Sequence, residues 1–208
     1  MLHYRLHNGL GGLVAAFSFA ATVHAAIVLL FRLVPFPAAV FRHGYDISFI
    51  PSLALKWLAV LLSAASAAIC EETGFRGYMQ RPIERRFGIV AGVLISSFFF
   101  TVLHLSKSWA LLGMIPTVFG AGVLLGLIAW ASGSLIPGMI GHFVMDVGLF
   151  GYWWTGIAGN FTARPITDTG VDRLFLITCV VLLSMCAIEL LAIDRLRRTS
   201  GSRPAPDL

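Results

Sequence analysis

Residues 51–76 read PSLALKWLAVLLSAASAAICEETGFR. Residues 51–70 are almost wholly apolar, with Lys56 as their one charged side chain, and they run directly into the carboxylates of Glu71 and Glu72. An apolar run of this length can cross the ~30 Å hydrocarbon core of a bilayer as a helix. The stretch therefore predicts a membrane-spanning helix that carries an acid pair at or inside its end.

The composition of the whole chain points the same way. The chain has 208 residues, of which 58% are hydrophobic and only 12% are charged, and its mean hydropathy is +0.86. These values lie far outside the range of soluble domains. The formal charge of +5 comes from cations that cluster at the ends of apolar runs, as membrane anchors do. We therefore expect contacts with membrane lipids and no nucleic-acid partner.

The other long apolar runs predict the rest of the fold. Together with the run from Pro51 they give about six spans, and we expect an all-α, polytopic transmembrane helix bundle that forms a single membrane domain over residues 1–208. The tail 195–208 is basic and poor in apolar residues, which predicts a disordered cytoplasmic segment. The remaining predicted spans are Leu10–Val34, Gly88–Leu105, Trp109–Ala131, Ser134–Trp154 and Leu174–Ile193.

The distribution of cations predicts the orientation. An even number of spans places both termini on one side, and cytoplasmic loops carry the excess of Lys and Arg. Nine cations fall on the side of the termini and five on the other, so both termini are predicted to be cytoplasmic. The nine are Arg5, Arg76, Arg81, Arg85, Arg86, Arg195, Arg197, Arg198 and Arg203, and the five are Arg32, Arg42, Lys107, Arg164 and Arg173.

Ionisable residues inside the predicted spans are candidates for a functional site. Each costs on the order of 2.5–3.5 kcal/mol to insert, so such groups tend to face an interior cavity. Glu72 and Arg76 have the i, i+4 spacing at which an acid and a base meet on a helix. Glu71 lies about 100° around the same helix and is free for another role.

Two later spans each contribute an imidazole. Phe100 and His104 share one helix stripe, and His142 and Asp146 share another, both at i, i+4 spacing. A lone intramembrane His is equally explained by a hydrogen bond between helices. An acid pair with its own cation and two His residues on separate helices is a stronger pattern, because it suits water activation by a carboxylate and an imidazole.

The rise of an α-helix predicts that Glu71 and His104 lie at different depths in the membrane. If the second helix ends at Pro82 and the third begins at Gly88, Glu71 lies about 16 Å and His104 about 24 Å from the turn between them. We expect a tilt, or a later start of the third helix, to close this gap.

These motifs resemble those of a known family. Glu71-Glu72-Thr73-Gly74-Phe75-Arg76 matches EExxxR, Phe100 to His104 matches FxxxH, and His142 to Asp146 matches HxxxN/D. This order is similar to that of the CAAX protease and bacteriocin-processing (CPBP, or Abi) family, relatives of the type II CAAX prenyl endopeptidases. The similar region covers about residues 53–150.

The resemblance implies an intramembrane endopeptidase in a bacterial inner (plasma) membrane, with an active site in a membrane-embedded cavity that opens toward the cytoplasm. Its substrate would be a peptide or protein with a membrane-proximal or C-terminal cleavage site. By motif, Glu71 would be the general base on water, helped by His104, while His142 and Asp146 would stabilise the oxyanion. The residues that would support the site are Glu72, Arg76 and Phe100.

The last motif departs from the prenyl-protein-processing relatives, which have Asn where this chain has Asp146. Asn can donate a hydrogen bond to an oxyanion and an ionised Asp cannot. Three alternatives stay open: Asp146 is protonated, it orients His142, or it binds a metal.

A metal mechanism is the second reading of the same residues. Glu71, His104 and His142 would form a Zn²⁺ ligand set with an open position for water. We favour the glutamate mechanism without a cofactor, because the HExxH pair of many zinc proteases is absent. Two other functions compete with proteolysis: an intramembrane proton-coupled transporter, and a non-catalytic membrane scaffold or immunity protein.

Overall fold

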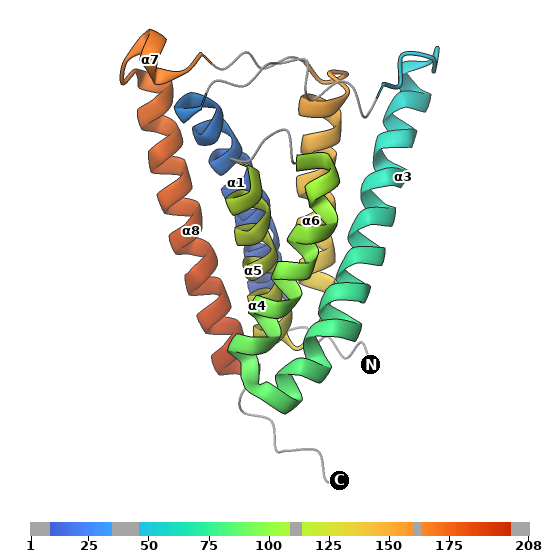
Figure 1. Ribbon diagram of the computed structural model, residues 1–208, viewed down its shortest axis with the longest axis vertical. Helices are drawn as coiled ribbons and strands as arrows, with labels where there is room; N and C mark the ends of the chain where they lie inside the picture. Colours follow the sequence, from blue (N-terminus) through green and yellow to red (C-terminus); the bar gives the residue numbers. More distant parts are fainter. Residues whose placement is uncertain (1–8, 35–45, 109–113, 160–163, 201–208) are drawn as a thin grey trace.

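The computed structural model describes residues 9–34, 46–108, 114–159 and 164–200, and it confirms the all-helical prediction (Figure 1). No strand occurs in these ranges. The elements, in chain order, are α1 (Gly9–Leu33), α3 (Leu53–Glu71), the π-helix η2 (Glu72–Gln80), α4 (Arg81–Ser108), α5 (Met114–Ser132), α6 (Ile136–Gly148), the π-helix η3 (Leu149–Trp154), the short α7 (Ile166–Thr169) and α8 (Arg173–Ser200).

Four helical stretches in the described ranges are long and apolar enough to cross a bilayer. They are Gly9–Leu33, Leu53–Leu105, Met114–Ser132 and Arg173–Thr199. The second stretch contains two legs, because α3 descends to the end of the bundle and α4 returns from it (Figure 1). Helix α6 has only 13 residues and is continued by η3. The result is a polytopic helical bundle.

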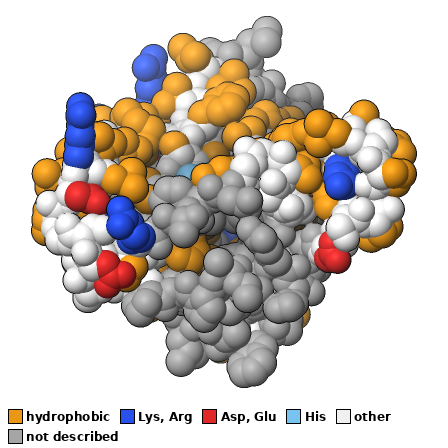
Figure 2. All heavy atoms as spheres, turned by 90° about the horizontal axis from the view of Figure 1, so that it is seen from above, with side chains coloured by type: hydrophobic (Ala, Val, Ile, Leu, Met, Phe, Trp, Pro, Cys, Tyr) orange, Lys and Arg blue, Asp and Glu red, His pale blue; other side chains and the backbone are white. Residues whose placement is uncertain are grey.

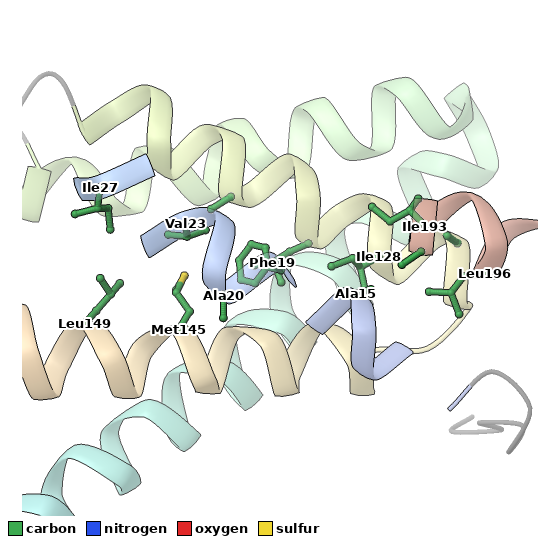
Figure 3. Close-up of a cluster of buried hydrophobic side chains, with 14 of the residues drawn as sticks. Ala15, Phe19, Ala20, Val23, Ile27, Ile128, Met145, Leu149, Ile193 and Leu196 are labelled. Atoms are coloured by element: carbon green, nitrogen blue, oxygen red, sulfur yellow. The ribbon is translucent and has the colours of Figure 1, made fainter. Parts of the chain in front are cut away.

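Helix α1 forms the centre of the packing and contacts α8, α6 and α5. Its buried face is mostly small, aromatic and β-branched side chains, and Phe19 and Val23 lie opposite Met145 and Leu149 (Figure 3). Gly141 of α6 allows a close approach, since a Cβ there would lie 2.9 Å from the carbonyl oxygen of Ala16. This contact fixes α6, which carries one imidazole of the candidate site, against α1.

Apolar side chains cover the outer surface of the bundle, as expected for contact with lipid. Figure 2, seen from the α7 end, shows hydrophobic atoms around much of the rim. Helix α8 is the clearest case, because large side chains along it are exposed while its other face packs on α1 and α5. Its exposed residues include Leu176, Val180, Leu183, Leu190 and Leu191.

The predicted disordered tail is partly wrong. Helix α8 continues to Ser200, and residues 201–208 lie outside the described ranges. Leu196 is buried in the core, and Asp194 pairs with Arg197 at 3.0 Å and with Arg198 at 2.7 Å. One buried apolar side chain and two ion pairs at i+3 and i+4 spacing extend the helix beyond the apolar run.

The second helix does not end at Pro82, the position assumed in the depth estimate from helix rise. The helical path runs through Pro82 and breaks at Gly88, whose φ of 85° and ψ of 167° are not helical. The wide turn of η2 immediately precedes Pro82, and such local π adjustments re-satisfy the backbone groups that a proline disturbs. The turn is therefore at Gly88, almost equally far along the chain from Glu71 and from His104, so the expected difference in depth between these residues disappears.

Two of the arginines counted for the orientation, Arg76 and Arg32, are buried. Arg76 lies inside the bundle and no longer counts as a cation on the side of the termini. That side still has more cations than the other. Arg32, in the last turn of α1, pairs with Asp172 at 2.7 Å and donates to the carbonyl of Arg164 at 2.6 Å. The beginning of α1, the end of α8 and the α3–α4 turn lie at one end of the bundle (Figure 1).

Candidate active site

Three helices bring the predicted site residues together. Glu71 is the last residue of α3, His104 lies near the end of α4, and His142 lies in the middle of α6. The Oε2 atom of Glu71 is 3.8 Å from Nε2 of His104 and 3.7 Å from Nε2 of His142. Side chains separated by up to 71 residues in the sequence thus meet around one carboxylate oxygen.

Burial divides the site into an accessible and an enclosed part. The side chains of Glu71 and His104 are 28% and 23% exposed, whereas Glu72, Arg76, His142 and Asp146 are buried. The first two can therefore meet a reactant that enters the bundle. The enclosed four form the rigid wall behind them.

The EExxxR motif crosses the junction of α3 and the π-helix η2. Glu72, at the start of η2, accepts a hydrogen bond from Nη1 of Arg76 at 3.1 Å, as the i, i+4 spacing predicts. The same oxygen, Oε1, lies 2.9 Å from Nδ1 of His142. Gly138 of α6 makes room for the second oxygen, because a Cβ there would be 3.2 Å from it. Short π-helical segments are frequent at functional sites.

Arg76 is held by three kinds of contact. Besides Glu72, it donates from Nη2 to the carbonyl oxygen of Gly122 on α5 at 3.0 Å. Its guanidinium also lies over the ring of Phe100, 4.5 Å from the centroid, a cation–π geometry. A buried charge is tolerated only when it is paired and hydrogen-bonded, and Arg76 meets both conditions.

Phe100 packs against the Arg76 guanidinium and both imidazoles. Its ring centroid lies 4.5 Å from that of His104, 6.2 Å from that of His142 and 5.3 Å from that of Phe75. One aromatic ring thus contacts both Arg76 and the two imidazoles of the candidate site.

Hydrogen bonds at Nδ1 indicate how the two imidazoles carry their protons. Nδ1 of His104 lies 2.7 Å from the carbonyl oxygen of Phe100, and Nδ1 of His142 faces the carboxylate of Glu72. A carbonyl oxygen and an ionised carboxylate only accept hydrogen bonds, so Nδ1 is the donor on each ring. A neutral ring then presents an unprotonated Nε2 toward Glu71.

Asp146 lies beside the second imidazole. Its Oδ2 is 3.5 Å from Nε2 of His142, with a buried side chain. Glu72, at 2.9 Å from the other ring nitrogen, is the closer carboxylate. The sequence did not predict this Glu72–His142 contact, since it depends on how η2 and α6 pack and leaves no spacing signal.

Glu71, His104 and His142 are the ligands of the alternative zinc mechanism. Their nitrogen–oxygen separations at Glu71 are 3.8 and 3.7 Å, and among the described residues no group of three His, Cys, Asp or Glu side chains is arranged to hold a metal ion.

A bundle of apolar helices that encloses this set of acids and imidazoles defines the class: a polytopic membrane protein with an interior polar site. Residues 52–148 match the family model described as Rce1-like, type II CAAX prenyl endopeptidase Rce1-like. The match confirms the resemblance: residues 52–148 are similar to an Rce1-like domain, which is consistent with the CAAX protease family. No curated protein and no solved structure matches the chain.

Proposed function

We propose that this chain is a glutamate-type intramembrane endopeptidase that hydrolyses a peptide bond near the membrane. The family match supports a CAAX-type protease at the family level. The observation that carries the mechanism is the convergence of two Nε2 atoms on Oε2 of Glu71, at 3.8 and 3.7 Å. The substrate class is a peptide or protein with a membrane-proximal or C-terminal cleavage site.

In this proposal Glu71 and His104 activate the water. Oε2 of Glu71 is buried and has no hydrogen-bond partner among the described residues. A water between it and Nε2 of His104 would lie within hydrogen-bond reach of both. Glu71 takes one proton as the water oxygen attacks the carbonyl carbon, and His104 accepts a hydrogen bond from the other O–H and orients it.

His142 and Asp146 stabilise the charge that develops on the carbonyl oxygen. In its imidazolium form His142 donates from Nδ1 to Glu72 and from Nε2 to the oxyanion, and the Glu72 carboxylate balances its charge. A protonated Asp146 is a second donor, equivalent to the Asn of the prenyl-processing relatives. The carbon–nitrogen bond then breaks, and Glu71 returns its proton to the leaving amine.

The orientation belongs to the proposal as well. We take the end with the α3–α4 turn and both termini as cytoplasmic, on the cation bias of the sequence. Glu71 is the last residue of α3, and η2 and the first residues of α4 lead from it to the turn at Gly88. In this orientation the site would accept substrates from the cytoplasmic side of a bacterial inner membrane.

The test is cleavage of fluorogenic membrane-proximal peptides by the full chain in proteoliposomes. Wild type is compared with Glu71→Ala, His104→Ala and the outward-facing control Phe98→Leu. We expect hydrolysis by wild type and the control, and a loss of about 10²–10⁴-fold in both site variants. Unchanged cleavage in both site variants would refute the assignment.

Two further comparisons distinguish the glutamate mechanism from the metal mechanism and from a transporter or scaffold. Activity that persists after exhaustive chelation supports the glutamate mechanism, whereas loss and recovery on adding Zn²⁺ would favour the metal mechanism. A transporter or scaffold would hydrolyse nothing. The acid outside the site that a proton path could use, Glu189, is fully buried on α8, which packs mainly on α1 and α5.

A further inference from the structure

Gln80, the last residue of η2, is a buried amide in the turn that follows the candidate site. Its side chain is about 1% exposed. Its Nε2 donates to the carbonyl oxygen of Gly126 at 2.9 Å and to Oε1 of Glu84 at 2.6 Å. Burying an amide is unfavourable unless it is hydrogen-bonded; both amide hydrogens of Gln80 are used, while its Oε1 has no hydrogen-bond partner among the described residues.

The Gln80–Gly126 bond repeats the Arg76–Gly122 bond one turn further along. Each donor on η2 reaches a backbone carbonyl of α5, and each pair is separated by 46 residues. Both donors and both acceptors advance by four residues in the same direction. Two hydrogen bonds, four residues apart on each helix, therefore hold η2 against α5. Together they oppose both a shift of η2 along its axis and a rotation about that axis.

Three glycines make this fastening possible. A Cβ at Gly126 would lie 2.9 Å from Oε1 of Gln80, and a Cβ at Gly92 would lie 3.2 Å from the carbonyl oxygen of Gln80. A Cβ at Gly122 would lie 3.1 Å from Cβ of Ser97. The small-xxx-small spacing of Gly122 and Gly126 thus brings α5 against η2 and α4.

We infer that Gln80 is a positioning residue for the reaction, an inference that rests on the proposed function. By locking η2 on α5, Gln80 sets where Glu71 and Glu72 stand relative to His142 on α6. Reactive groups must be held within about 0.5 Å of the productive geometry. A displacement of about 1 Å from a change outside the reacting groups can lower the rate about 10²-fold.

The first test replaces Gln80 with Met, which keeps the length of the side chain and removes the donor. In proteoliposomes, Gln80→Met should lower kcat about 10- to 100-fold, with KM changed less than about twofold because Gln80 touches no substrate. Gly120→Ala is the matched control on α5, since a Cβ there meets nothing within 4 Å. Wild-type kcat in Gln80→Met, or a rise in KM alone, overturns the inference.

The second test does not depend on activity. Gly126→Ala should lower the midpoint of thermal unfolding in the wild-type background and lower it less in a Gln80→Ala background, where the closest clash is gone. Equal losses in both backgrounds overturn the proposed clamp. If wild type itself hydrolyses nothing, the proposed function fails while this cycle still reports on the clamp. If Gln80→Met does not fold, kcat is measured on Gly126→Ala instead, because the added methyl group displaces η2 from α5.

Discussion

Oε1 of Glu72 lies 2.9 Å from Nδ1 of His142 and 3.1 Å from Nη1 of Arg76. This one buried oxygen therefore links η2 to α6. It also pairs with Arg76, which donates a hydrogen bond to α5. Glu72 and His142 form the contact through which the acid doublet and the HxxxD motif become one structure.

Replacing Glu72 with Ala should both unfold and inactivate the protein. The change leaves Arg76 as a buried charge without its acid and His142 without its Nδ1 acceptor. Breaking one partner of a buried pair costs about 3–5 kcal/mol. Thermal unfolding in detergent micelles should show a large drop for Glu72→Ala and none for the exposed Asp168→Ala. A Glu72→Ala protein as stable as the control would contradict the central place of this oxygen.

The spacing of the motifs predicted a large part of this arrangement. The i, i+4 interval pairs Glu72 with Arg76 because both lie on one helix. The free-energy cost of placing Glu71, His104 and His142 inside the membrane predicted that these side chains face a common interior site. The Glu72–His142 and Arg76–Gly122 contacts could not be predicted from one sequence. They depend on how separate helices pack, and packing leaves no local spacing.

Two differences between the expected and the observed fold have local physical causes. The depth estimate assumed a helix end at Pro82, where proline disturbs the preceding turn, but η2 accommodates the proline and the chain breaks at Gly88. The charged stretch from Arg195 predicted disorder, but Leu196 is buried and Asp194 binds two arginines. In both cases a tertiary or side-chain contact outweighed a composition signal.

Asp146→Asn tests how the last motif acts. If Asp146 donates to the oxyanion as a protonated acid, Asn replaces it with another donor, and kcat should stay within about threefold of wild type. Asp146→Ala removes the donor and should lower kcat about 10²–10³-fold. Initial rates in proteoliposomes measure both variants. Equal inactivation by Asn and Ala would instead assign Asp146 a role that needs its charge, such as orienting His142.

Phe100→Leu should weaken the site without removing a polar group. It takes the ring away from the Arg76 guanidinium and from His104, at a cost of about 1–3 kcal/mol in stability. We expect a lower kcat, because both imidazoles lose a packing surface. Phe99→Leu is the matched control, since Phe99 is 46% exposed on the same helix. Equal effects of the two changes would show that Phe100 has no special role.

The ion pair at the opposite end of the bundle predicts a dependence on acid. The backbone N–H of Phe175 and the Arg32 guanidinium hold the pKa of the Asp172 carboxyl below its ordinary value of 3.8. A depressed pKa gives a stabilisation that is present above pH 3.8 and is lost as the pH falls through the folded-state pKa. The difference in unfolding midpoint between wild type and Asp172→Asn should therefore be constant near neutrality and shrink below about pH 3.8. A difference that grows in acid would contradict this pairing.

The most direct test of the account compares wild type with Glu71→Gln in water enriched in ¹⁸O, with one peptide that wild type cleaves in proteoliposomes. Gln keeps the size of the side chain and removes the base. The account predicts ¹⁸O in the new C-terminal carboxylate of the wild-type product, and a cleavage rate lower by about 10²–10⁴-fold in Glu71→Gln at an unchanged unfolding midpoint. Equal rates in the two proteins would contradict the claim that Glu71 activates the water.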